Sequence, residues 1–190
     1  MAAAQRLFME RGFDGASMDA IAEAAGVAKA TVYARFPDKE ALLKASIAAK
    51  CQSFLDPETL DWRFGRTLRD GLIGIARRFL SLVTDPEAVG MHRLMTQEGQ
   101  RSDRLPALFF QSAIRPTVLR LAQFLDDEAM FNHSGDPVDP VAAAWRFLGM
   151  VKGEDHMRAI FGMTPRSQKE IDLHIEQCVD DFIRANFPKA

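Results

Sequence analysis

Apolar residues along the chain recur at the three- and four-residue spacing of helices, and no stretch shows the convincing alternation of a strand. One apolar stripe consists of Leu68, Leu72, Ile75, Phe79 and Leu82, and a second of Ile171, Ile175, Cys178, Val179, Phe182 and Ile183. Neither a repeat nor a low-complexity tract interrupts this pattern. The sequence therefore predicts an all-α fold.

Polar residues and prolines divide the pattern into separate helices. Asp56 and Pro57 predict the end of a helix that begins after Asp38, and with it a hinge into a second, larger domain. Pro86 and Pro140 stand where a first helical residue is expected, since proline has no N–H to lose there. A helix is expected near Pro106, bent or restarted at Pro116. Ser167 to Glu170 forms a capping box that predicts the start of the last helix.

The segment from Ser17 to Val32 has the pattern of two short helices joined by a tight turn. Ser17 is expected to cap the first helix, and Ala22 is small, as required where two helices cross closely. Gly26 suits the left-handed conformation of the turn. We expect Val27 and Val32 to fill the wedge between the two helices. This combination is typical of a helix-turn-helix.

The second of these helices presents a polar face with no acidic residue between Glu23 and Asp38. Its outward positions are Lys29, Ala30, Thr31, Tyr33 and Arg35. Asp38 is expected to cap the next helix, which carries Lys39 in its first turn. A neutral to positive face of this kind suits DNA, although a small helical subdomain with solvated charges would show the same apolar periodicity.

At this point the sequence resembles the TetR family of bacterial transcriptional regulators. The matching residues are Gly12-Phe13, Ile21-Ala22, Ala25-Gly26-Val27, Thr31-Val32-Tyr33, Phe36, Lys39-Glu40 and Leu42. This specific motif covers about the first fifty residues. A looser likeness to one subgroup of sensor domains rests on Asp85-Pro86-Glu87, Arg93-Leu94, Glu98, Arg101 and Leu105-Pro106.

The resemblance implies a three-helix helix-turn-helix DNA-binding domain at residues 1–50 and a larger helical effector-binding and dimerisation domain at 51–190. Lys29, Ala30, Thr31 and Tyr33 would lie on the recognition helix, with Tyr33 and Lys39 contacting phosphates and Ser17 doing so from the helix before. Arg35 would face DNA. Sequence does not separate base-reading residues from phosphate contacts.

The resemblance also implies a homodimer formed by the last two helices, which would bind a palindromic operator in double-stranded DNA. The apolar stripe of the last helix is equally explained by packing against the chain's own core. One departure from the family is Ala28, which stands where Ser or Thr is usual and leaves the recognition helix without a side-chain cap. Relatives also commonly carry a basic arm before the point at which this chain opens.

A small-molecule cavity between the later helices is a further family implication. Its candidate lining residues are Phe79, Met91, Met95, Phe109, Phe110, Phe124 and Trp145, which suit a largely apolar effector. Plain core packing explains each of them as well. Arg93, Glu98 and Arg101 are candidates for orienting a polar group or for helix-surface ion pairs. We expect a repressor that such an effector releases from DNA.

Composition adds little to this interpretation. The net charge is −2, and residues 1–50 hold seven Lys or Arg against six Asp or Glu, so electrostatics alone does not indicate DNA. The two cysteines, Cys51 and Cys178, suggest neither a disulfide framework nor a metal site, and no cofactor motif is present. Without a signal peptide or an apolar run of membrane length, the protein is expected in the cytoplasm.

Two other classes of function compete with a DNA-binding regulator. The four histidines show no zinc-binding spacing, and no nucleophile elbow, phosphate loop or dinucleotide fingerprint occurs, so we do not expect an enzyme. A ligand-binding or protein-interaction module on the same helical scaffold, without a role on DNA, remains the alternative.

Overall fold

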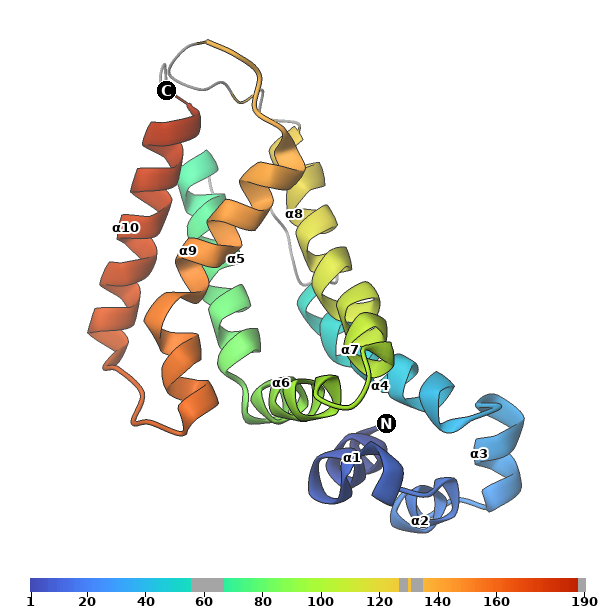
Figure 1. Cartoon of the computed structure of the whole chain (residues 1–190). Helices are drawn as coiled ribbons and strands as arrows, with labels where there is room; N and C mark the ends of the chain where they lie inside the picture. Colours follow the sequence, from blue (N-terminus) through green and yellow to red (C-terminus); the bar gives the residue numbers. More distant parts are fainter. Residues whose placement is uncertain (56–66, 127–129, 131–134, 188–190) are drawn as a thin grey trace. The chain divides into compact units, whose positions relative to one another are not determined.

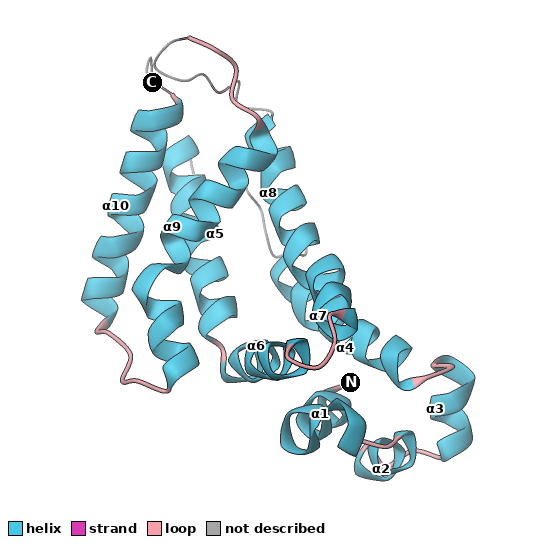
Figure 2. Cartoon of the chain, in the orientation of Figure 1, coloured by secondary structure: helices cyan, strands magenta, loops and turns pink. Residues whose placement is uncertain are grey.

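A computed structural model of the chain describes residues 1–55, 67–126, 130 and 135–187. Within these ranges the regular elements are all helices, with an isolated bridge at Pro137 and no strand (Figure 2). The predicted all-α class is confirmed. The hinge predicted at Asp56 and Pro57 lies outside the described residues.

The helices follow one another along the chain as labelled in Figure 1. They are α1 (Ala2–Gly15), α2 (Met18–Ala24), α3 (Lys29–Arg35), α4 (Lys39–Leu55), α5 (Leu68–Thr84), α6 (Pro86–Gly99), α7 (Arg104–Phe109), the π-helical turn η1 (Phe110–Ile114), α8 (Arg115–Asp126), α9 (Pro140–Phe161) and α10 (Gln168–Asn186).

Two compact units divide the chain. The first unit joins Met1–Ser53 to Pro86–Arg115, and the second joins Phe54–Asp85 to Pro116–Ala190. Helices α6 and α7 therefore pack with the N-terminal helices, and a shared apolar core runs from Phe8 and Leu43 to Leu94 and Phe109. The compact units thus differ from the predicted division by function into 1–50 and 51–190, which stays a prediction.

Local start signals correspond to observed helix starts. The Asp139 carboxylate accepts hydrogen bonds from the N–H groups of Val141 and Ala142, ahead of Pro140 at the first position of α9. Ser167 and Glu170 form the predicted capping box of α10. Helix α7 begins at Arg104, two residues before the predicted Pro106. At Pro116 the helix continues without a break, because the π-helical turn precedes it: the N–H of Arg115 bonds to the carbonyl of Phe110, five residues back.

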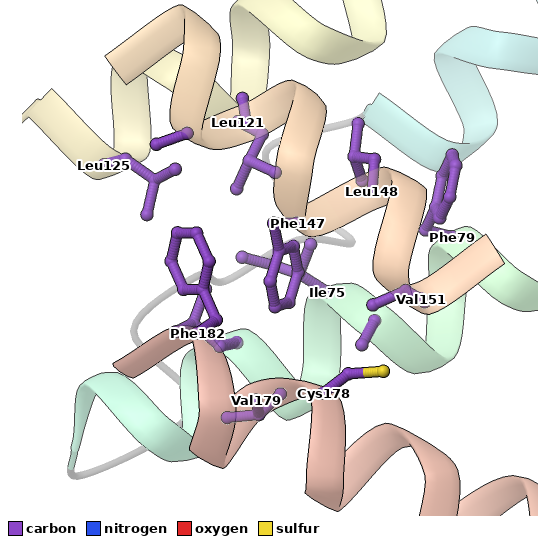
Figure 3. Packing of buried hydrophobic residues seen from close by; sticks show 14 of the residues in the cluster. Ile75, Phe79, Leu121, Leu125, Phe147, Leu148, Val151, Cys178, Val179 and Phe182 are labelled. Atoms are coloured by element: carbon purple, nitrogen blue, oxygen red, sulfur yellow. The ribbon is translucent and has the colours of Figure 1, made fainter. Parts of the chain in front are cut away.

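The core of the second unit is built by α5, α8, α9 and α10 (Figure 3). The rings of Phe147 and Phe182 meet edge to face, with centroids 4.9 Å apart. Ile175, Cys178 and Val179 of α10 are buried in the same cluster. Most of the apolar stripe predicted on α10 thus faces the core of its own chain, while its first and last members, Ile171 and Ile183, are only half-buried.

Helix α9 has a kink at Gly153 that no sequence signal indicated. Gly153 has φ 34° and ψ −140°, a backbone conformation that side chains disfavour. The imidazole of His174 on α10 lies against the kink, with its Nε2 3.2 Å from the carbonyl oxygen of Val151. A side chain at position 153 would crowd this ring, since an added Cβ would lie 3.0 Å from Nε2. The ring of His174 therefore packs closely against the backbone of the kink.

Candidate DNA-binding surface

Helix α2 and the turn after it are closed by local hydrogen bonds. The Ser17 hydroxyl accepts from the N–H of Ala20 at 3.1 Å, which makes Ser17 the cap that the sequence predicted. Beyond α2, the N–H of Gly26 bonds to the carbonyl of Glu23 and that of Val27 to the carbonyl of Ala22. With Gly26 at φ 65°, this is a Schellman turn, in which glycine avoids the strain of a left-handed residue.

The wedge between α2 and α3 is filled differently from the prediction. Val32 is buried as expected, and Ala22 is fully buried where the helices come close. Val27, however, is 43% exposed, so its predicted role in the wedge is wrong. The reason is the turn itself: the N–H of Val27 closes it, and the side chain is left outside the two-helix interface.

Helix α3 turns nearly all of its side chains to solvent, because Val32 is its one buried residue. The predicted DNA-facing residues on it are all exposed: Lys29, Ala30, Thr31, Tyr33 and Arg35. Tyr33 is half exposed, at 50%. At the start of α3, Ala28 occupies the cap position and no side chain caps the helix, as the sequence predicted.

Lys29 is paired in a way that the sequence did not indicate. Its ammonium donates to the Asp19 carboxylate of α2 at 2.5 Å, an ion pair across the turn between exposed side chains. The hydrogen bond and the charge of Asp19 raise the pKa of Lys29 above its usual value. The pair could not be predicted from the sequence, because residues ten apart on different helices show no local signal.

Lys39 is held by neutral groups at the start of α4, where the Asp38 carboxylate accepts from the N–H of Ala41 at 2.7 Å as predicted. The Lys39 ammonium donates to the backbone carbonyl of Asp14 at 3.3 Å and lies 4.5 Å from the ring centroid of Phe13. These contacts fix the side chain without cancelling its charge. Like the pairing of Lys29 with Asp19, these contacts of Lys39 with Phe13 and Asp14 were not predicted from the sequence.

The residues predicted to line an effector cavity fall into the two units rather than into one. Met91, Met95 and Phe109 are buried in the core of the first unit, where Phe110 is 40% exposed. In the second unit Phe79 is buried, Phe124 is half-buried against the same core, and Trp145 is 43% exposed. Of the three polar candidates, Glu98 is buried while Arg93 and Arg101 are exposed.

Metal-binding side chains are not grouped in the part of the chain that the structure describes, where no three His, Cys, Asp or Glu residues could together hold an ion. Cys51 and Cys178 are free thiols, and burial raises the pKa of Cys51 to about 11. Among the same described residues, no helix has both the length and the apolar content needed to span a bilayer.

A capped α2, a glycine turn and an exposed α3 anchored by one valine define a helix-turn-helix protein of the DNA-binding kind. Comparison with known proteins gives the family. Residues 1–46 match the family model of the bacterial regulatory proteins of the tetR family, and residues 70–185 match the C-terminal domain of AefR-like transcriptional repressors. The chain belongs to the TetR family of transcriptional regulators, proteins that are generally not enzymes.

Solved structures agree with this assignment. The flavonoid-responsive regulator FrrA is 36% identical and matches 100% of this chain and 95% of its own, with a TM-score of 0.76. A putative TetR-family regulator from Mesorhizobium loti MAFF303099 is 26% identical over 96% of this chain and 92% of its own, also with a TM-score of 0.76. Bacillus subtilis FadR, solved with stearoyl-CoA, shares the fold at 19% identity, covering 96% of this chain and 95% of its own (TM-score 0.69). No curated protein matches the chain.

Proposed function

We propose that the protein is a repressor that binds a palindromic operator as a homodimer and leaves it when a small, largely apolar effector binds. Residues 1–50 would read the DNA, and 51–190 would bind the effector and form the dimer. The observation that carries the DNA-binding half is the solvent-facing surface of α3, with Val32 as its single buried residue. A regulator of this kind acts on the chromosome, so we propose a cytoplasmic location.

We assign the contacts with the phosphate backbone of the DNA to Ser17, Tyr33 and Lys39. Lys39 suits this role because its ammonium lies beside neutral groups, the Asp14 carbonyl and the Phe13 ring. Lys29, Ala30, Thr31 and Arg35 of α3 would face the major groove, where lysine and threonine can reach either base edges or phosphates.

Salt dependence of DNA binding tests these contacts. Fluorescence anisotropy of labelled duplex DNA would be measured at several salt concentrations for the wild type and for the double variant Lys29→Gln/Lys39→Gln. The variant should bind more weakly, with the slope of log K against log salt reduced by about 0.9 for each phosphate that it no longer neutralises. Arg78→Gln/Arg115→Gln, which removes two exposed charges from α5 and α8, away from the helix-turn-helix and from the proposed dimer helices, is the matched control. Equal slopes for all three proteins would contradict the proposal that Lys29 and Lys39 contact DNA phosphates.

Dimerisation is supported by apolar side chains that one chain leaves in solvent. On α9 these are Val141, Trp145, Met150, Met157 and Phe161, with Met163 beyond its end and Leu173 on α10. Phe161 is 67% exposed, a large apolar surface for a side chain at the end of a long helix. A second copy of the chain, packed through α9 and α10, would cover them. Pairing two short recognition helices also supplies the affinity that one lacks.

For the effector, FrrA is the relative that bears most directly on chemistry, because it matches the whole chain and its name describes a flavonoid response. We propose a planar aromatic or otherwise largely apolar compound. Its effect on DNA binding is limited by the difference between its affinities for the two arrangements.

A release assay tests the effector. Flavonoids, other planar aromatic compounds and a long-chain acyl-CoA would be titrated into the preformed protein–DNA complex while anisotropy is followed. Release by an aromatic compound at concentrations that leave an unrelated helix-turn-helix protein bound to its own DNA would support the proposal. If no compound changes the anisotropy, release by an effector is contradicted, whereas the proposed DNA binding is unaffected.

A further inference from the structure

The two lysines of the DNA-binding surface are held by different kinds of partner. Lys29 faces a carboxylate, that of Asp19, at 2.5 Å, whereas Lys39 faces a carbonyl oxygen and an aromatic ring. A carboxylate cancels the charge of the ammonium it binds, and a carbonyl or a ring does not. In the free protein, therefore, Lys39 is ready for a phosphate and Lys29 is already occupied by an anion.

From this contrast we propose that Asp19 is a positioning residue that competes with DNA phosphates for the ammonium of Lys29 and so limits the affinity of the surface for DNA. The inference rests on the proposed DNA-binding role. Any phosphate that takes Lys29 must displace Asp19 or accept a carboxylate beside it. Either way, the interaction releases fewer counterions and gains less affinity than that of a free lysine would.

Of the two acidic residues of α2, Asp19 is the one that contacts Lys29. Asp19 lies in the first turn of α2, and its side chain reaches across the turn to the first residue of α3. Glu23, also exposed on α2, forms no salt bridge with Lys29, and its charge raises the pKa of Lys29 less than Asp19 does. Both side chains in the Asp19–Lys29 pair are about half exposed or more, at 49% and 65%, so the pair is open to exchange with an incoming phosphate.

The test is a double-mutant cycle with Asp19→Asn and Lys29→Gln, in which binding to duplex DNA of random sequence is measured by anisotropy at several salt concentrations. Asp19→Asn should tighten binding by about two- to fivefold at low salt, the range expected for removing an exposed ion pair, and steepen the salt dependence. In the Lys29→Gln background the same substitution should have little effect, because the ammonium that Asp19 competes for is gone.

Glu23→Gln is the matched control, since it removes the same charge from the same helix. Equal tightening by Glu23→Gln, or undiminished tightening by Asp19→Asn in the Lys29→Gln background, would reduce Asp19 to a general charge effect and overturn the proposal. Asp19 also stabilises the positive end of α2, so thermal unfolding of each variant is measured to separate a loss of stability from a change in DNA binding. If the wild type fails to bind DNA, the proposed function fails; if it binds and Asp19→Asn changes nothing, this inference alone fails.

Discussion

At the residue scale, Ala28 determines how the recognition helix begins. Its backbone is extended, at φ −64° and ψ 140°, as a capping residue requires, but it has no side-chain oxygen. Ala28→Thr should therefore raise the free energy of unfolding by about 1 kcal/mol, because the hydroxyl can accept from the N–H of Ala30 or Thr31. Urea unfolding compares it with the isosteric Ala28→Val, which should gain nothing. Equal stability of the two variants would show that the missing cap is irrelevant.

Substitution by alanine is expected to have opposite effects on the free energy of unfolding at Gly26 and at Gly74. Both have open space where a Cβ would lie, so backbone conformation alone decides the result. Gly26 has φ 65°, and Gly26→Ala should lower the free energy of unfolding by about 1–2 kcal/mol. Gly74 lies inside α5, where Gly74→Ala should raise it by about 0.5–1 kcal/mol. The same denaturant titration measures both, and matching signs would contradict the conformational argument.

At the element scale, His156 joins α9 to α5 through a hydrogen bond from its Nδ1–H to the Val83 carbonyl, at 2.9 Å. Burial lowers the pKa of His156 below its usual 6.5; the bond to Val83 opposes this shift, and repulsion from Lys152 adds to it. The unfolded chain binds the proton of His156 more readily than the folded chain does. The contribution of the neutral, buried His156 to stability is therefore complete above the unfolded pKa of about 6.5. It is lost as the pH falls below that value toward the lowered folded pKa.

His156→Gln tests this pH dependence, because an amide can also donate to Val83 but does not titrate. Between about pH 7.5 and about pH 5.5, the wild type should lose more stability than the variant in urea unfolding. Parallel losses would mean that His156 does not titrate differently in the folded and unfolded chains.

Element boundaries could be predicted from sequence where the signal is local. The capping box at Ser167 and the Asp139-Pro140 start belong to this class, since each depends on residues within one helical turn. The kink at Gly153 was not predicted, and the ring packed against it, that of His174, comes from another helix. Packing of α6 with the N-terminal helices depends likewise on contacts distant in sequence. At the site, the exposed face of α3 followed from its periodicity, whereas the Asp19–Lys29 pair did not.

At the scale of the whole molecule, the dimer proposed above depends on the exposed apolar side chains of α9. Met157→Glu/Phe161→Glu should convert the protein to a monomer, because two carboxylates cannot be buried unpaired in an apolar interface. Light scattering coupled to gel filtration measures the mass, and operator affinity should fall about a hundredfold or more when the two recognition helices are no longer linked. Leu119→Glu, at an exposed apolar position on α8, is the control and should stay dimeric. A dimeric double variant would place the interface elsewhere.

In the proposed function, two copies of α3 read a palindromic operator. Selection of duplexes from a randomised DNA pool by the wild-type protein, followed by anisotropy with unlabelled competitor, tests it even though the operator sequence is not known. We expect enrichment of an inverted repeat whose half-sites lie about one helical turn, roughly 34 Å, apart, with binding that resists competitor and is weaker in Lys29→Gln/Lys39→Gln. A pool that stays random after selection, or an enriched sequence that the double variant binds equally well, would contradict it.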